Sequence, residues 1–265
     1  MPVIPGLGWT FDTVASTYAK LRPGYVDALY QEVFAYRPLE ASSCAVEVGI
    51  GGGQATGPIL QTGCAVTAVE PGENFCALCR EKFAAYPGFA ALNGKFEDVP
   101  LESSAYDLVY SASAFHWVPE EIGYRKAFDV LKSGGAFARF ANHPWRDKGN
   151  PALADALDEV YAKHYHAHYR TEPRKEPEYT EEQAIRRAEI AGKYGFTDIR
   201  HRLYHRRRSF TAQEYTVLLG TYSDHIAIPE EKRLPFFCAV EEAINAHGGT
   251  IVLYDTIDLQ LARKP

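Results

Sequence analysis

No stretch of this sequence approaches the roughly 18 consecutive apolar residues that a membrane-spanning helix requires, so we expect no membrane span and no membrane partner. The first residues, MPVIPGLGWTFD, also lack the basic flank and the continuous apolar core of a signal peptide. The five cysteines are an odd number without the spacing of a disulfide framework. Together these absences predict a protein of the reducing cytoplasm.

Positive charge is not in excess either, because 28 lysines and arginines face 34 acidic residues, which gives a net charge of -6. A chain without a basic field has no general means of holding a nucleic-acid backbone, so we expect no nucleic-acid partner. One local exception is the run HRLYHRRR at 201–208. In a strand, alternation would place Arg206 and Arg208 on one face, as a solvated edge or as a positive rim for an anionic substrate.

A metal site is not expected. Cys76 and Cys79 form a CxxC motif, but no second ligand pair lies at zinc spacing, which favours two thiols packed on one helix face. His164, His166 and His168 cluster in KHYHAHYR, but no carboxylate or cysteine completes a site within that segment. Partly buried imidazoles on a helix are the better interpretation.

The length of 265 residues and the hydrophobic content of 46% predict one domain with a single large core. In the first half, apolar runs typical of strands alternate with helical segments. This order predicts βαβ units and a mainly parallel sheet. The expected strands are 44–48, 65–70, 106–113 and 135–142, and the expected helices are 74–86 and 121–131, the latter ended by the turn KSGG (132–135).

The second half has a different pattern. A sheet-covering helix is predicted at 181–196, a strand at 198–210 and a final strand at 249–264. Polar and helical stretches at 143–180 and 211–247 interrupt this core, so we expect them to be insertions that form a helical cap.

The strongest local signal is the segment VEVGIGGGQAT, which begins at Val46. It carries the pattern E-x-G-x-G-x-G, and such glycines let a backbone loop approach a ligand closely. The strict dinucleotide fingerprint G-x-G-x-x-G fails, because Gln54 occupies the position of its last glycine. The residues of the observed pattern are Glu47, Gly49, Gly51 and Gly53.

Glu70 ends the second predicted strand, 17 to 21 positions after those glycines. A carboxylate at this place can accept hydrogen bonds from both hydroxyls of a ribose, because its two oxygens match a vicinal diol. The alternative is a surface acid at a strand end. The glycine loop before it favours the ribose interpretation.

The order of four features resembles that of the class I S-adenosylmethionine-dependent methyltransferases. These features are the glycine loop, Glu70, the stretch NGKFEDVPLESSAYDLVYSASAFHWV and the turn KSGG. The resemblance implies a Rossmann-like α/β sheet, mainly parallel with an antiparallel last strand and flanked by helices. It also implies that the loop binds the methionine part of S-adenosylmethionine, and that Phe96 and Glu97 lie against the adenine. Many relatives carry an acid where this chain has Lys95, so the partner of the adenine amino group stays open.

The segment FDTVASTYAKLRPGY (11–25) resembles a small-molecule subgroup that includes trans-aconitate methyltransferase-like and ubiquinone- or menaquinone-biosynthesis-type enzymes. In that subgroup the N-terminal flank folds over the cofactor. Tyr18 and Arg22 are four residues apart, so on a helix they share one face. The resemblance implies that Arg22 pairs with the cofactor carboxylate and that Tyr18 covers the methionine end.

Four residues are candidates for the methyl-transfer site. His116 and Trp117 follow the fourth predicted strand directly, and the carboxyl end of that strand faces the ligand crevice of an open α/β sheet. The FHW sequence there also resembles the trans-aconitate methyltransferase-like subgroup. Tyr222 and His225 are polar candidates from the cap. The alternative for His116 and Trp117 is a structural role, in which both side chains only pack under the next helix.

We therefore expect a single methyltransferase domain, 1–265, that moves a methyl group to a small-molecule acceptor. The alternatives are an NAD-dependent oxidoreductase on a similar fold and a non-catalytic cofactor-binding protein. The acceptor, the methylated atom and the oligomeric state stay open. The expected division is an N-terminal helical flank (1–35), a cofactor-binding core (36–142), the two cap insertions, and the rest of the core sheet (181–210 and 248–265).

Overall fold

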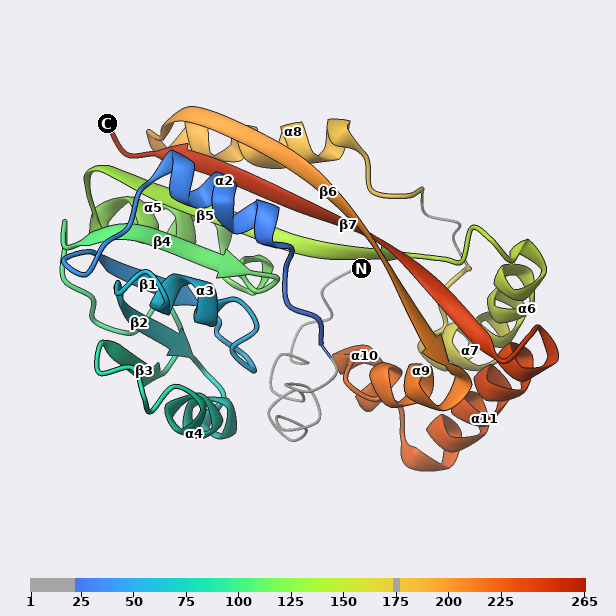
Figure 1. Ribbon diagram of the computed structural model, residues 1–265. Helices are drawn as coiled ribbons and strands as arrows, with labels where there is room; N and C mark the ends of the chain where they lie inside the picture. Colours follow the sequence, from blue (N-terminus) through green and yellow to red (C-terminus); the bar gives the residue numbers. More distant parts are fainter. Residues whose placement is uncertain (1–21, 174–176) are drawn as a thin grey trace.

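A computed structural model of the chain describes residues 22–173 and 177–265. In this part of the chain a twisted sheet with covering helices forms a core lobe, and a group of helices forms a second, helical lobe. Three strands of the sheet are 14 or 15 residues long. These long strands run from one lobe into the other (Figure 1).

The sheet has seven strands in the order β3-β2-β1-β4-β5-β7-β6. Strands β1 to β5 are mutually parallel, while β7 is inserted between β5 and β6 and runs antiparallel to both. This confirms the expected mainly parallel sheet with an antiparallel last strand. The strands are β1 (Cys44–Val48), β2 (Ala65–Glu70), β3 (Phe89–Asn93), β4 (Tyr106–Ala112), β5 (Leu131–Trp145), β6 (Thr197–Thr211) and β7 (Thr250–Arg263).

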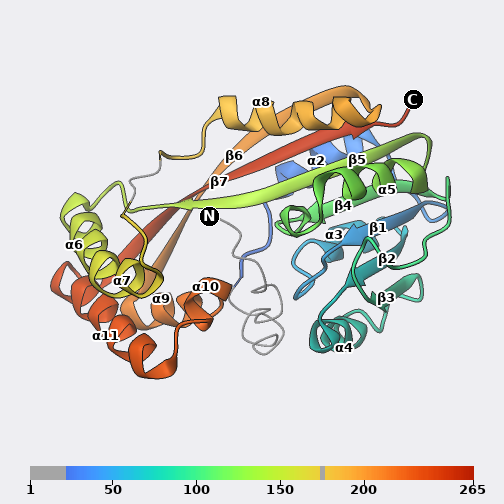
Figure 2. The same ribbon diagram turned by 180° about the vertical axis from the view of Figure 1, so that it is seen from behind.

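Helices cover both faces of the sheet in the core lobe. The helices α2 (Asp27–Tyr36), α3 (Thr56–Leu60) and α4 (Glu73–Lys82) contribute to one apolar cluster on one face. On the other face, seen in Figure 2, lie α5 (Glu120–Val130) and α8 (Glu181–Glu189), which continues as the 3₁₀ helix η4 (Ile190–Tyr194). The sheet is therefore the middle layer of three.

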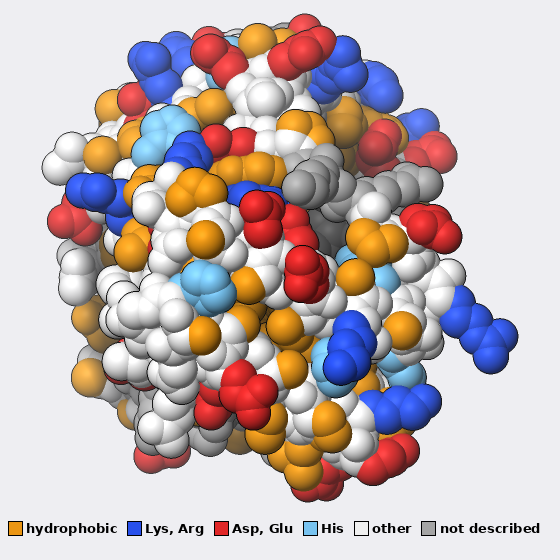
Figure 3. Space-filling view, turned by 90° about the vertical axis from the view of Figure 1, so that its right-hand side faces the viewer, with side chains coloured by type: hydrophobic (Ala, Val, Ile, Leu, Met, Phe, Trp, Pro, Cys, Tyr) orange, Lys and Arg blue, Asp and Glu red, His pale blue; other side chains and the backbone are white. Residues whose placement is uncertain are grey.

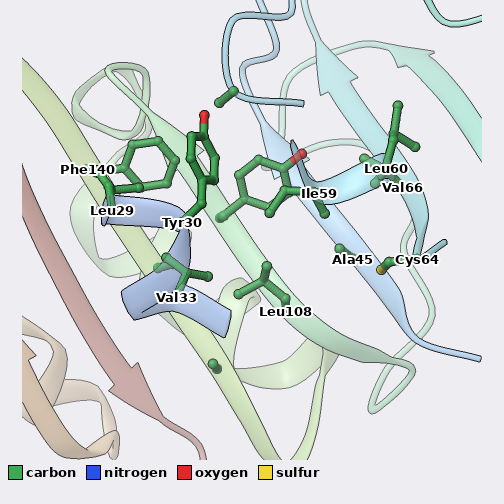
Figure 4. Packing of buried hydrophobic residues seen from close by; sticks show 14 of the residues in the cluster. Leu29, Tyr30, Val33, Ala45, Ile59, Leu60, Cys64, Val66, Leu108 and Phe140 are labelled. Carbon is green, nitrogen blue, oxygen red and sulfur yellow. The ribbon is translucent and has the colours of Figure 1, made fainter. Parts of the chain in front are cut away.

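The packing of α2 shows how the sequence builds the first face. Val33 follows Leu29 by four residues and Tyr30 by three, and this helical spacing places all three side chains on the inner side of α2. They meet Leu108 of β4 and Phe140 of β5 in one buried cluster (Figure 4). Burying such side chains contributes roughly 1.5–3 kcal/mol each, which fixes α2 on the sheet.

Helices from the two segments expected to form a cap pack together as the helical lobe, although 143–145 belong to β5 and Tyr179 stacks on His143 of that strand. Its helices are α6 (Pro151–Tyr161), the π-helix η3 (Ala162–His166), α7 (Ala167–Tyr169), α9 (Ala212–Leu219), α10 (Ser223–Ile226) and α11 (Glu230–Ala246). They share a third apolar cluster that includes Leu153, Leu218, Phe236 and Ile251. Because β5 runs from the core lobe into this region, the helical lobe lies beyond the carboxyl ends of the parallel strands.

Three local features differ from the expectations. The segment KSGG is not a turn before the fifth strand but lies inside β5, where the pairing with β4 shifts between Tyr106 and Leu108 and Gly134 has a φ of 75°. The glycines that predicted a turn form part of a β-bulge instead. The predicted helix 181–196 changes from α to 3₁₀ geometry at Ile190. Strand β3 has no counterpart among the predicted strands, because its five residues, FAALN, carry no clear alternation.

Figure 3 views the helical lobe end-on, and lysines, arginines and acidic residues are interspersed over this face. None of the helices in the described ranges is both long and apolar enough to cross a membrane.

Candidate active site

The glycine loop follows β1 and is tightly enclosed. Gly49, Gly51 and Gly53 have φ values of 73°, 50° and 70°, which side-chain-bearing residues rarely adopt. A Cβ atom on Gly49 would clash with Ala114, two residues after the end of β4. A Cβ atom on Gly53 would lie 2.6 Å from the ring of Phe83. The loop therefore needs glycine for its conformation and for its close contact with neighbouring elements.

Glu70 ends β2 beside this loop and is only 8% exposed. Its Oε2 accepts a hydrogen bond from the Gly51 N–H at 3.0 Å, and its Oε1 accepts one from the Gly72 N–H at 2.9 Å. Each carboxylate oxygen has two lone pairs, so a carboxylate can accept about four hydrogen bonds. The structure thus brings together the loop and the acid that the sequence pattern paired.

Glu47 lies under the loop rather than on its surface. Its side chain is fully buried, and Oε2 accepts hydrogen bonds of 2.7 Å from both the Thr56 and the Tyr110 hydroxyl. Its Oε1 atom is buried without a hydrogen-bond partner. Burial raises the pKa of Glu47 to about 7, against the effect of the two hydroxyl donors. Glu47 therefore joins β1, β4 and the start of α3 from inside.

Two side chains that no sequence pattern assigned to the site also hold the loop. Lys82 Nζ donates to the carbonyl oxygens of Gly52 and Gly53 at 2.8 and 3.0 Å. The Cys79 thiol donates to the Gly51 carbonyl at 3.2 Å, and burial raises its pKa to about 12. Neither contact has a sequence signal, because it joins residues 28 to 30 positions apart. In the described residues, no three His, Cys, Asp or Glu side chains are grouped to hold a metal ion.

The segment expected near adenine begins just after β3. Phe96 is 3% exposed and packs in the core, with its ring centroid 6.5 Å from that of Phe115. The backbone carbonyl of Glu97 accepts a hydrogen bond from Lys126 Nζ at 3.2 Å, while its side chain is half-buried. The structure therefore places Phe96 under this segment and leaves Glu97 nearer the surface.

His116 and Trp117 form the 3₁₀ turn η2 (Phe115–Trp117) after β4, with ring centroids 5.1 Å apart. The His116 ring reaches solvent. Even so, the surrounding protein partly desolvates it, and the positive charges of Arg139 and Arg187 lie nearby, so its pKa is lowered to about 4. The imidazole is neutral at pH 7, the form that can accept a proton or a hydrogen bond.

Arg22 joins the N-terminal flank to the helical lobe. Its Nε donates to the Thr221 hydroxyl at 3.1 Å and its Nη2 to the Thr221 carbonyl at 3.0 Å. The guanidinium also lies over the Tyr222 ring, 3.9 Å from the centroid. Tyr18, which was expected to share a helix face with Arg22 and to cover the methionine end of the cofactor, lies outside the described residues. The flank and the 221–222 turn are therefore neighbours, although 199 positions separate the two hydrogen-bonded residues.

His225 is buried inside the helical lobe at 3% exposure. Its Nδ1 is 2.9 Å from Asp224 Oδ1 and its Nε2 is 3.0 Å from the Tyr161 hydroxyl. The Asp224 carboxylate accepts a hydrogen bond from Nδ1–H, and the Tyr161 hydroxyl pairs with Nε2 on the other side of the ring. In this arrangement His225 holds the 221–225 turn in place, and Tyr222 is the more accessible of the two cap candidates.

Comparisons with known proteins add to this geometry. A family model described as a methyltransferase domain matches residues 46–138. An uncharacterized methyltransferase of Schizosaccharomyces pombe is 24% identical over 244 residues, which cover 90% of this chain and 88% of that protein. An uncharacterized methyltransferase of a Geobacillus species is 30% identical over 166 residues, which cover 59% of this chain and 75% of that protein.

Two solved structures share the fold. A candidate type II methyltransferase of Anaeromyxobacter dehalogenans has a TM-score of 0.62 at 20% identity, covering 91% of this chain and 97% of that one. Phosphoethanolamine N-methyltransferase 2 of Haemonchus contortus, in complex with S-adenosyl-L-methionine, has a TM-score of 0.54 at 15% identity, covering 96% of this chain and 57% of that one. At these identities the likeness is one of fold.

Proposed function

This chain belongs to the methyltransferase family, and from that premise we propose that it transfers a methyl group from S-adenosylmethionine to a small-molecule acceptor. The observation that carries the proposal is the pairing of Glu70 with the Gly51 N–H at the carboxyl end of β2. It joins a ribose-type carboxylate to a glycine loop whose geometry excludes side chains.

The charges around the loop fit this cofactor. S-adenosylmethionine carries a positive sulfonium, and the Glu70 carboxylate lies directly against the loop at the Gly51 N–H. A dinucleotide would bring a pyrophosphate dianion to the same place. The Gly51 amide, which could bind such a phosphate, donates to Glu70 instead. The helix after the loop, α3, has only five residues, which leaves a weak dipole for a phosphate. These features disfavour the NAD-dependent alternative.

In this proposal, different residues of the site bind different parts of S-adenosylmethionine. The loop residues Gly49, Gly51 and Gly53 accommodate the methionine part, with Glu47 holding the loop from below. Glu70 binds the ribose hydroxyls, and the segment with Phe96 and Glu97 lies along the adenine. The flank residues Tyr18 and Arg22 close over the methionine end, where Arg22 connects the flank to the helical lobe.

The acceptor would lie between η2 and the 221–225 turn. A sulfonium-bound methyl group is already activated, so the protein's main task is to align the acceptor and exclude water. Trp117 supplies an apolar wall for this purpose. The neutral His116 can accept a proton from an acceptor that must lose one. Tyr222 presents a hydroxyl from the helical lobe, and His225 positions that turn.

Calorimetry with S-adenosylmethionine, S-adenosylhomocysteine and NAD tests the cofactor. We expect saturable binding of the first two and none of NAD. Glu70→Ala should weaken S-adenosylhomocysteine binding about tenfold or more, since losing a charge-assisted hydrogen bond costs roughly 1.5–3 kcal/mol. Gly51→Val should abolish it. The control Glu73→Ala removes an exposed acid at the start of α4 and should bind normally.

NAD binding without S-adenosylhomocysteine binding would overturn the proposal in favour of the oxidoreductase. Normal cofactor affinity in a folded Gly51→Val protein would refute the placement in the loop. Cofactor binding with no methyl transfer to any member of a broad acceptor panel would favour the non-catalytic alternative.

A further inference from the structure

One face of the long strands carries two apolar clusters with a charged stretch between them. Alternate residues of β7 point to this face. Ile251 and Leu253 belong to the cluster of the helical lobe, and Ile257 and Leu259 belong to that of the core lobe. The residue between the two pairs is Asp255, which is 1% exposed. The charged stretch therefore lies where the sheet passes from one lobe to the other.

Two arginines of β6 converge on this single carboxylate. Arg206 donates to Asp255 Oδ2 from Nε at 3.3 Å and from Nη2 at 3.1 Å. Arg208 donates from Nε to Oδ2 at 2.5 Å and from Nη2 to Oδ1 at 2.9 Å. Within the described residues neither arginine has a second carboxylate partner. Two guanidiniums facing one carboxylate leave a net positive charge.

That charge is shielded from water and incompletely hydrogen-bonded. The side chains of Arg206 and Arg208 are 21% and 13% exposed, and Asp255 is wholly enclosed. The Arg208 Nη1 atom is buried without a hydrogen-bond partner. Keeping an unmatched charge and an unpaired donor at a largely buried place is costly, so such a group calls for a compensating anion. The exposed parts of the two guanidinium-bearing side chains are where such an anion would bind.

Through Asn142, Arg206 is connected to Ser113 at the end of β4, near the proposed methyl-transfer site. Arg206 Nη2 donates to Asn142 Oδ1 on β5 at 3.2 Å, and the Asn142 N–H donates to Ser113 Oγ at 3.2 Å. Ser113 immediately follows β4, three residues before His116. Arg206 Nη1 also donates to the Gly24 carbonyl of the N-terminal flank at 2.9 Å. Although β6 is three strand positions from β4, the Arg206 guanidinium reaches Asn142 on β5, the strand next to β4. Because neighbouring strands lie about 4.8 Å apart, this places the guanidinium within roughly 10 Å of the end of β4.

We propose that Arg206 and Arg208 bind an anionic group of the methyl acceptor, either a carboxylate or a phosphate. The planar guanidinium forks suit both groups. The anion would balance the unmatched positive charge of the two arginines and hold the acceptor with its reactive atom toward η2. This inference rests on the proposed function and deepens it by naming the class of acceptor.

The chain supplies a matched control in Arg207. It lies between the two arginines on β6, but alternation directs it to the opposite face, where it is exposed and borders a separate hollow with Asp147 and Tyr254. Arg207→Gln therefore removes the same charge from the same strand without touching the charged stretch.

The test titrates succinate and inorganic phosphate into the protein with and without saturating S-adenosylhomocysteine, at constant ionic strength. Succinamide serves as the neutral counterpart of succinate. We expect at least one anion to bind and succinamide not to bind. Arg206→Gln and Arg208→Gln should each weaken anion binding by at least about tenfold, which is about 1.4 kcal/mol, and Arg207→Gln should change it less than twofold. The anion that binds more tightly identifies the group.

Arg208→Lys keeps the charge beside Asp255 and guards against a glutamine variant that does not fold. It should retain the fold but lose part of the anion affinity, because an ammonium cannot bind bidentately. The proposal is overturned if neither anion binds the wild type, if Arg208→Lys and the glutamine variants bind like wild type, or if Arg207→Gln is equally weakened. Failure of the wild type to bind S-adenosylhomocysteine would instead overturn the proposed function, while the titrations without it still decide the anion site.

Discussion

Replacing Glu47 by glutamine should make the stability of this protein less sensitive to pH. The carboxyl group is fully buried, and burial raises its pKa from 4.5 to about 7. In the unfolded chain it loses its proton near pH 4.5, whereas in the folded protein it keeps the proton up to about pH 7. Between these values folding takes up a proton, so the group's contribution to stability falls as the pH rises.

The magnitude follows from the two pKa values. Between pH 5.5 and pH 8 the penalty from Glu47 should grow by about 2 kcal/mol, because a tenfold change in proton affinity corresponds to about 1.4 kcal/mol and titration is partial at both ends. Glutamine does not titrate. Its carbonyl can replace Oε2 as the acceptor for the Thr56 and Tyr110 hydroxyls, while its amide would occupy the place of the unpartnered Oε1. That last cost does not depend on pH.

Urea denaturation of wild type and Glu47→Gln at pH 5.5 and pH 8, without cofactor, measures the effect. Subtracting the two proteins removes the titration of every other group. The stability difference should shift by about 2 kcal/mol in favour of glutamine at the higher pH. Glu73→Gln, at an exposed position on α4, should differ from wild type by less than ~0.5 kcal/mol at both values. A Glu47→Gln difference that stays constant across this range would refute the reasoning.

Two further predictions concern the loop and η2. Gly49→Ala should destabilise the protein by roughly 2–4 kcal/mol, because alanine disfavours a φ of 73° and its Cβ would clash with Ala114. The control Gly57→Ala has open space around the new Cβ and should change stability by less than ~1 kcal/mol in the same urea assay. Equal costs at both glycines would contradict the enclosed loop. Once an acceptor is known, His116→Ala and Trp117→Phe should lower turnover or acceptor affinity while S-adenosylhomocysteine binding stays within about threefold. With neutral His116 as the proton acceptor, the wild-type rate of methyl transfer should stay constant from pH 8 to about 5 and fall toward pH 4. Normal rates in both variants would place His116 and Trp117 outside the methyl-transfer site.

Local patterns account for most of the elements of this fold. Strands β1, β2 and β4 and the helix α5 lie within one residue of their predicted limits, because alternation and helical spacing depend only on neighbours in the chain. The antiparallel last strand came from the resemblance to a known family, and the sheet order confirms it. The bulge in β5 was not predictable from KSGG, since the same glycines suit a turn and a bulge.

The cofactor part of the candidate site was predicted from local sequence patterns. The spacing of the loop glycines and the position of Glu70 after a strand carry the expected chemistry, and the structure joins Gly51 and Glu70 by a hydrogen bond. The sequence did not reveal that Glu47 is enclosed between Thr56 and Tyr110, because burial depends on what packs over a strand from elsewhere in the chain.

The sequence by itself determined the alternation of strands and helices, the glycine loop and the methyltransferase family, because each is written in residues close together along the chain. Only the tertiary structure decided which distant residues meet. It placed Arg22 on Thr221 and directed Arg206 and Arg208 to Asp255. These pairings depend on the insertion of β7 between β5 and β6 and on the return of the chain through the helical lobe. Sheet order and loop paths are set by the packing of the whole chain, and no local pattern of charge encodes them.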